Sequence, residues 1–256
     1  MNYRNKLIWY RICEETFLSE LEWGKRFVID HMISSMPTGE REAQIAVQEI
    51  NETYTCDEND DPSYIAEMKE DRRTEILLRF ESIRQSAINM SSVMLWHLLE
   101  QQILEFYMKT VLSPDEERLV RYGEDKKMRY SSLYIVEMLR RLRENGLDIE
   151  FCPSWSKVEE LRMLANALKH GIGRSSDKLN SIRPDLFIID ELLQAKDCGF
   201  ERSSHIRRPA GGDGIYVRES DVVDYFDAAI NLWKYIFDRI EELSSLESNI
   251  DSDEYY

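Results

Sequence analysis

An unbroken run of apolar side chains at helical spacing constrains the fold of this chain more than any other feature. From residue 76 to residue 98 an apolar residue recurs every three or four positions: Ile76, Phe80, Ile83, Ala87, Met90, Met94 and Leu98. This spacing places all of them on one face of an α-helix. We therefore predict a single helix from about Tyr64 to Leu112, ended by Ser113-Pro114, as the spine of a helical bundle.

Shorter segments with helical periodicity flank this long helix. They cover residues 5–35 and 40–52 before it, and 131–144 and 220–240 after it. The expected fold class is therefore all-α, with one short extended segment or β-hairpin near residues 215–218. We divide the chain into an N-terminal helical extension (1–61), a helical domain (62–243) and an acidic tail (244–256). We expect the tail to be disordered, because six acidic and no basic residues follow from position 241.

The net charge excludes a protein whose whole surface binds nucleic acid. The chain of 256 residues carries a net charge of −16, whereas binding to phosphates requires a basic surface. Its hydrophobic content of 43% is high enough for a sizeable core. One region departs from the acidic background: residues 162–218 hold 10 Lys and Arg against 7 Asp and Glu, a net charge of +3. A basic binding site, if present, is expected in this region.

Cysteine usage and hydropathy indicate a cytoplasmic protein. The four cysteines, at positions 13, 56, 152 and 198, form no Cys-x-x-Cys pair, and we expect free, mostly buried thiols. No apolar run of membrane-spanning length is present, so we expect no membrane partner. The four histidines are scattered and no ligand spacing typical of zinc occurs. We expect neither a metal ion nor an organic cofactor.

The candidate functional residues lie at the end of one predicted helix. A capping box of Ser156 and Glu159 begins this helix and Gly171 ends it. On it, Arg162, Asn166 and the pair Lys169-His170 form a polar stripe, since residues four apart share a helix face. A stripe that contains a cation and an imidazole is typical of a ligand-binding or active surface. Lys169 and His170 could instead simply stabilise the negative end of the helix dipole.

These residues resemble the HEPN superfamily of helical nucleotide-binding and ribonuclease domains. The resemblance covers residues 76–240, and its most specific part is 161–187. That part contains Asn166 and His170 four apart, the run Gly173-Arg174-Ser175 and the run from Arg183 to Phe187. The resemblance implies a HEPN-like core in the helical bundle, with two copies of this helix meeting in a homodimer or against a protein partner.

The resemblance also implies a function: a metal-independent ribonuclease, or an RNA-associated effector, in prokaryotic antiviral defence or a toxin–antitoxin system. Cleavage of RNA by its own 2′-hydroxyl needs a proton-transfer group and a cation beside the phosphoryl oxygens. We assign the catalytic role to His170, with Asn166 orienting it and Arg162 stabilising charge. Phosphate contacts are expected from five further cations: Lys169, Arg174, Arg183, Arg207 and Arg208.

One departure from the family pattern leaves a second function open. HEPN ribonucleases usually carry an arginine directly before the asparagine, where this chain has Ala165. The alternative is therefore a catalytically degenerate HEPN-like subunit that binds or scaffolds a larger complex. A third alternative is a purely structural dimerisation protein. The glycine-rich loop from Arg207 to Gly214 is also open to two interpretations, a contact for phosphate or a solvated turn.

Overall fold

The computed structural model describes residues 7–53, 62–122, 135–188 and 208–253, and the fold class is all-α as predicted. Within these ranges there is no β-strand, and a single isolated bridge joins Arg208 to Asp213. The predicted extended segment near 215–218 has no regular secondary structure. Of the helices that the structure describes, none combines the length and the apolar character needed to cross a membrane.

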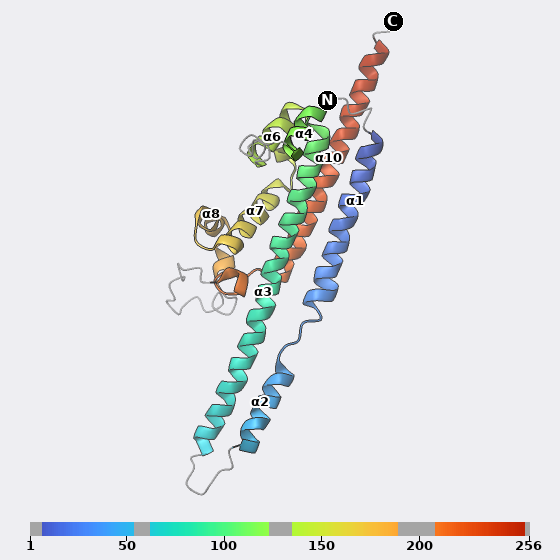
Figure 1. The fold of residues 1–256 in the computed structure, drawn as a ribbon. Helices are drawn as coiled ribbons and strands as arrows, with labels where there is room; N and C mark the ends of the chain where they lie inside the picture. Colours follow the sequence, from blue (N-terminus) through green and yellow to red (C-terminus); the bar gives the residue numbers. More distant parts are fainter. Residues whose placement is uncertain (1–6, 54–61, 123–134, 189–207, 254–256) are drawn as a thin grey trace. The chain divides into compact units, whose positions relative to one another are not determined.

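The long predicted helix is present as α3, Pro62–Thr110 (Figure 1). It is preceded by α1 (Leu7–Arg26), a π-helical segment (Phe27–Ile33) and α2 (Glu40–Thr53). It is followed by α4 (Pro114–Tyr122), α6 (Ile135–Glu144), α7 (Trp155–His170), α8 (Arg174–Ile182) and α10 (Glu219–Asp253). Three 3₁₀ turns complete the described elements: Ile149–Phe151, Pro184–Phe187 and Pro209–Gly211.

The chain divides into two compact units, each assembled from distant parts of the sequence. Unit 1 comprises residues 1–26, 92–165 and 220–256, and unit 2 comprises 27–91 and 166–219. The helices α3 and α7 each begin in one unit and end in the other. Neither unit coincides with the domain ranges expected from the sequence.

Aromatic side chains form the core of unit 1. There α1, the second half of α3 and α10 lie side by side (Figure 1). The ring of Trp233 on α10 lies 4.7 Å from that of Phe17 on α1 and 5.4 Å from that of Phe106 on α3, measured between centroids. The indole N–H of Trp233 donates to the buried amide of Gln102 at 2.8 Å, so the one polar group of this ring is satisfied.

In unit 2 a loop is fastened to α3 by a buried amide. The side chain of Asn89 donates to the carbonyls of Pro209 and Ile215, each at 2.8 Å, and accepts from the backbone N–H of Val217 at 3.3 Å. Gln85, one turn earlier, donates to the carbonyl of Val217 at 2.9 Å. These bonds replace the backbone pairing that a loop without secondary structure lacks.

The apolar stripe that predicts α3 is only partly buried. Ile83 is 61% exposed and Met90 is 44% exposed. The buried face of α3 instead carries the polar residues Asn89, Ser91 and Ser92 beside Ile88 at its middle, and it becomes mainly apolar from Val93 onward. The predicted helix is therefore confirmed, and part of its apolar stripe is exposed. The polar loop contacts of Asn89 define the inner face there.

Two helix boundaries also differ from expectation. α7 begins at Trp155, because the carbonyl of Ser154 already accepts from the N–H groups of Lys157 and Val158. Ser156 thus lies inside the first turn and does not cap it. At the other end of the chain, α10 continues through Asp253, into the segment expected to be a disordered tail.

Candidate functional site

The end of α7 presents three of the predicted site residues to solvent. Lys169 and His170 are exposed, and Asn166 is half-buried on the same final turns. Gly171 follows with φ of +69°, a left-handed conformation that favours glycine, and its N–H donates to the carbonyl of Ala167 at 2.8 Å. The predicted helix end is confirmed. Within the described residues, none of these three side chains has a hydrogen bond or an ion pair.

The following helix, α8, adds two more exposed cations. Arg174 is its first residue and Lys178 lies four positions later, so both share one face. The helix start is fixed by Ser176, whose hydroxyl accepts from the Gly173 N–H at 2.9 Å and donates to the Gly173 carbonyl at 2.7 Å. This local closure leaves Arg174 with no role in capping. Neither cation contacts a carboxylate among the described residues.

We call Lys169, His170, Arg174 and Lys178 the α7–α8 cationic surface. They are the only Lys, Arg or His side chains between Arg162 and Arg183 in the sequence, and Asp177 is the single acid there. All four belong to unit 2. Six arginines elsewhere in unit 2 hold a carboxylate within 4 Å: Arg72, Arg73, Arg79, Arg84, Arg183 and Arg218. Arg41 and Lys69 of the same unit have no ion pair among the described residues, so the α7–α8 cationic surface differs because it gathers four basic side chains without such a pair into residues 169–178.

Arg162, the third predicted catalytic residue, lies in unit 1 and is already engaged. Its Nε donates to Oε1 of Glu159 at 2.9 Å and its Nη2 to Oε2 at 2.7 Å, a bidentate pair within one turn of α7. Such a fork satisfies the strongest donors of a guanidinium. Ala165 is fully buried. The position that would carry the arginine of the family pattern therefore faces the interior of the protein.

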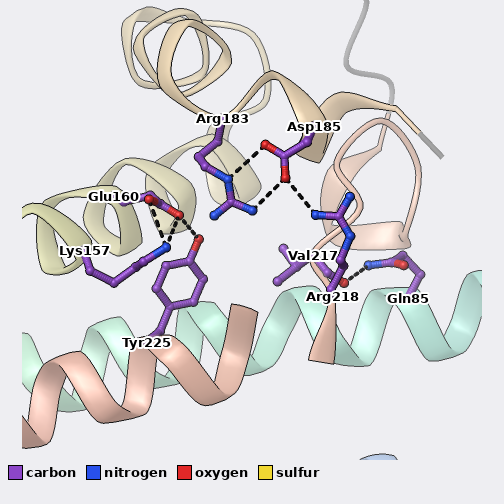
Figure 2. Close-up of polar contacts among 8 residues, drawn as sticks. All are labelled: Gln85, Lys157, Glu160, Arg183, Asp185, Val217, Arg218 and Tyr225. Atoms are coloured by element: carbon purple, nitrogen blue, oxygen red, sulfur yellow. Dashed lines mark hydrogen bonds and ion pairs between the residues drawn. The ribbon is translucent and has the colours of Figure 1, made fainter. Parts of the chain in front are cut away.

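Arg183 belongs to a second paired network, shown in Figure 2. It donates to both carboxylate oxygens of Asp185, at 2.9 and 2.8 Å, and Arg218 donates to the same carboxylate at 2.7 Å. The hydrogen bonds from Arg183, aided by Arg218, hold the pKa of Asp185 well below its usual range, although partial burial opposes them. The Arg183 side chain is only 17% exposed. This arrangement ties residues 183–185 to the start of α10.

The glycine-rich loop packs against α3. Arg207 lies outside the described residues. Arg208 is 81% exposed and reaches Asp213 only at 4.0 Å, while the two backbones exchange hydrogen bonds at 3.1 Å. Gly212 has φ of +75°, and a Cβ there would lie 2.3 Å from the carbonyl oxygen of Ser82 on α3. The N–H groups of Gly211 and Gly212 bond within the turn. Gly212 therefore allows close packing on α3, and the N–H groups of Gly211 and Gly212 are not available to an anion.

A cavity of about 740 Å³ in unit 2 lies between this loop and α3. Its charged lining is balanced, with three arginines and three acids: Arg84, Arg208, Arg218, Glu81, Asp213 and Glu219. Arg84 is paired with Glu219, and Arg218 with Asp185. A wall with equal numbers of both signs does not favour an anionic ligand.

Three further reactive side chains, those of Glu160, Cys13 and Cys152, are buried in unit 1. Glu160 accepts from the buried Tyr225 hydroxyl at 2.7 Å and from Lys157 at 3.1 Å (Figure 2). Burial, with a smaller contribution from a nearby glutamate, raises the pKa of the Cys13 thiol to about 12, so it is protonated at neutral pH and a poor nucleophile. Cys152 is likewise a buried free thiol. Cys56 and Cys198 lie outside the described residues.

Across residues 7–53, 62–122, 135–188 and 208–253, no three His, Cys, Asp or Glu side chains are grouped so that they could hold a metal ion.

Comparison with known proteins adds no assignment: no protein-family model, no curated protein and no solved structure matches the chain. The resemblance to HEPN domains therefore stays a prediction from the motif.

The sequence reasoning missed two features of this region. Lys178 belongs to the uncompensated surface and was detectable from its position four residues after Arg174 on one helix. Asp185 neutralises Arg183, and its place two residues later in the sequence was visible. The contribution of Arg218 was not detectable, because 33 positions separate it from Asp185.

Proposed function

We propose that this chain is an RNA-associated protein with a HEPN-like helical core, and that it binds RNA phosphates through the α7–α8 cationic surface. The observation that carries the proposal is that four basic side chains gathered in residues 169–178 have no carboxylate partner among the described residues, in a chain of net charge −16. Lysine and arginine side chains without an internal partner lose little when a phosphate binds them, and they release counterions from the RNA.

On this surface His170 is the group that would transfer a proton. In metal-independent cleavage, a base removes the proton of a ribose 2′-hydroxyl, the oxygen attacks the adjacent phosphorus, and the 5′-oxygen leaves with a proton from an acid. Lys169 and Arg174 would balance the charge on the phosphoryl oxygens. Asn166, one turn before His170, would orient the imidazole or the phosphate. A second copy of the chain would supply the second proton-transfer group.

A second candidate, an RNA-binding or scaffolding subunit without cleavage activity, has its own support. Ala165 is buried where HEPN ribonucleases usually carry an arginine. Arg162, the nearest cation on the N-terminal side of Asn166, is held by Glu159. Both facts weaken the charge stabilisation that cleavage requires, while leaving the exposed cations free to bind phosphate.

Binding is tested with a variant that removes the charge of the surface. The triple variant K169A/R174A/K178A should bind a 2′-O-methyl RNA 20-mer at least 10-fold more weakly than wild type, since each substitution removes one phosphate contact. The matched control, R41A/K69A/R118A, removes three other cations that also have no partner among the described residues and so alters the net charge equally. Equal losses in both variants would contradict a local site.

Cleavage is tested separately with natural RNA. Purified wild type and H170A are incubated with mixed tRNA and mRNA in the presence of EDTA. Cleavage by wild type and not by H170A supports the ribonuclease, and growth arrest on expression that H170A relieves would support a defence or toxin role. Binding without cleavage by either protein supports the second candidate.

A further inference from the structure

The cavity between α3 and the loop of residues 208–218 is suited to a ligand other than RNA. Its volume is about 740 Å³, and small-molecule sites commonly measure about 300–1,000 Å³. Its lining combines charges of both signs with apolar side chains. We propose that this cavity binds a short apolar peptide whose free ammonium and carboxylate termini contact Glu81 and Arg208. The inference goes beyond the proposed function and does not depend on it.

One face of α3 forms the first wall of the cavity. The lining residues of α3 that share this face are spaced three or four positions apart: Leu78, Glu81, Gln85 and Ile88. The helix rises by about 15 Å from Leu78 to Ile88, which matches about four residues of extended peptide. Ile88 is 3% exposed and Leu78 is 64% exposed. The wall therefore offers apolar surface at a buried end and at an open end, with Glu81 between them.

The loop forms the second wall, and its backbone is held in place. The carbonyl of Val217 accepts from the side chain of Gln85 at 2.9 Å (Figure 2), and its N–H donates to the side chain of Asn89 at 3.3 Å. The hydroxyl of Ser82 donates to the carbonyl of Gly211 at 3.0 Å. Because these bonds fix the loop against α3, the cavity is formed before a ligand arrives and binding has few groups to order.

Two arginines of the lining are engaged inside the protein. Arg84 forms an ion pair with Glu219. Arg218 donates to Asp185 at 2.7 Å. A ligand would have to compete with these carboxylates for either guanidinium. Recognition of a charged ligand therefore depends on the other charged groups of the lining.

Glu81 and Arg208 are the charges that a ligand can contact most readily. Glu81 is exposed and has no ion pair or hydrogen bond among the described residues. Arg208 is 81% exposed and reaches Asp213 only at 4.0 Å. Glu81 and Arg208 have opposite signs and lie on opposite walls, so a ligand with one charge of each sign can contact both. A purely anionic or purely cationic ligand would meet one of them as a like charge.

The remaining lining residues favour a peptide over a smaller zwitterion. Tyr216 lines the cavity, and its hydroxyl has no hydrogen bond within the described part of the chain. A phenol can donate to a peptide carbonyl or accept from a peptide N–H. Leu78, Ile88 and Val217 supply surface for apolar side chains. An apolar peptide of three or four residues uses both charges, the hydroxyl and the apolar surface.

The experiment measures binding of the tripeptide Leu-Ala-Leu and two blocked forms to the full chain by titration calorimetry. N-acetylation removes the ammonium charge of the peptide, and C-terminal amidation removes its carboxylate charge. Glu81→Gln should weaken binding of the free peptide by about 3- to 10-fold, and N-acetylation should then have no further effect. Arg208→Ala should weaken it by a similar factor and abolish the effect of amidation. Both side chains are exposed, so the variants should fold.

Matched controls remove exposed charges outside the cavity. Glu67→Gln on α3 and Arg41→Ala on α2 should each change peptide affinity by less than about 2-fold. The inference is overturned if wild type does not bind millimolar peptide, or if the blocked forms bind as tightly as the free one. It is also overturned if Glu81→Gln stays sensitive to N-acetylation.

The same variants separate this inference from the proposed function. Glu81→Gln should leave the affinity for the 2′-O-methyl RNA 20-mer unchanged, and K169A/R174A/K178A should leave the affinity for the peptide unchanged. Loss of peptide binding in K169A/R174A/K178A would place the peptide on the α7–α8 cationic surface and contradict the cavity site. Absence of RNA binding by wild type would remove the proposed function and leave the peptide result standing.

Discussion

Unit 2 contains two polar regions of opposite character. Around the loop of residues 208–218 nearly every named polar group has a partner, including the buried amide of Asn89 and the Arg183–Asp185–Arg218 network (Figure 2). At the α7–α8 cationic surface, the side chains of Lys169, His170, Arg174 and Lys178 have none within the described residues. The first region joins segments that are distant in sequence, and the second has no such internal contacts within the described residues.

Charge and residue type alone do not distinguish a side chain that is paired inside the protein from one that has no internal partner. Arg183 and Arg174 were predicted to have the same role, yet among the described residues Arg183 is paired with a carboxylate and Arg174 is not. The difference lies in the carboxylate of Asp185, which is paired with Arg183. Separating these two partly buried charges would cost free energy, so Arg183 stays bound to Asp185.

The largest effect is expected at Asn89. Asn89→Ala would leave the carbonyls of Pro209 and Ile215 and the N–H of Val217 without their partner, in a place where Asn89 itself has no solvent exposure. We expect a loss of about 2–4 kcal/mol in the free energy of unfolding, measured by urea denaturation. Asn180→Ala on the exposed face of α8 is the matched control and should change stability by less than about 0.5 kcal/mol.

A smaller loss is expected at Asp185. Asp185→Asn keeps the shape of the side chain but removes the charge shared by Arg183 and Arg218. About a third of the carboxylate is exposed and solvent screens the pairs, so the expected loss is about 1–2 kcal/mol at pH 7. Asp177→Asn, which breaks no ion pair among the described residues, is the control. Equal effects of the two substitutions would remove the distinction between the paired and unpaired regions.

The contribution of Asp185 should depend on pH with a definite sign. Its folded pKa lies below the unfolded value of about 3.9, so the carboxylate stabilises the folded state above that value. The stability difference between wild type and Asp185→Asn should be complete above about pH 5 and shrink as the pH falls through 4 toward the folded pKa. Urea titrations at pH 7, 5, 4 and 3 measure it, and a difference that grows on acidification would contradict the assigned network.

Much of the fold could be predicted from the periodicity of apolar residues. The spacing from Ile76 to Leu98 located α3 to within two residues at each end, and Gly171 located the end of α7. The buried face of α3 could not be predicted, because that face carries the polar residues Asn89, Ser91 and Ser92 at its middle. A hydrophobic pattern treats these as outward positions, whereas here the Asn89 amide bonds to a loop more than 100 residues away.

For the candidate site, the sequence predicted the placement of some residues and missed that of others. The exposure of Lys169, His170 and Arg174 agrees with a surface role, since residues at a helix end rarely reach the core. The engagement of Arg162 by Glu159 could have been read from their spacing of three. The network around Arg183 depends on Arg218, a tertiary neighbour that no local pattern reveals.

The salt dependence of RNA affinity tests whether the α7–α8 cationic surface contacts phosphates. For single-stranded RNA, each neutralised phosphate contributes about 0.7 to the slope of log affinity against log salt concentration. We expect K169A/R174A/K178A to flatten that slope by about 2, whereas R41A/K69A/R118A leaves it unchanged. Titrations of the 2′-O-methyl 20-mer at four salt concentrations measure both. An unchanged slope in the first variant would mean that these cations do not meet phosphates.

The smallest effect on stability is expected at His170, and it separates a helix end from an active group. A cation in the last turn of α7 interacts favourably with the helix dipole, so His170→Ala should lower the free energy of unfolding by less than about 1 kcal/mol. If the same substitution abolishes RNA cleavage while binding of the 2′-O-methyl 20-mer falls less than about 3-fold, the imidazole serves the chemistry and not the fold. If stability falls and RNA is unaffected, His170 only completes the helix, and the ribonuclease proposal loses its proton-transfer group.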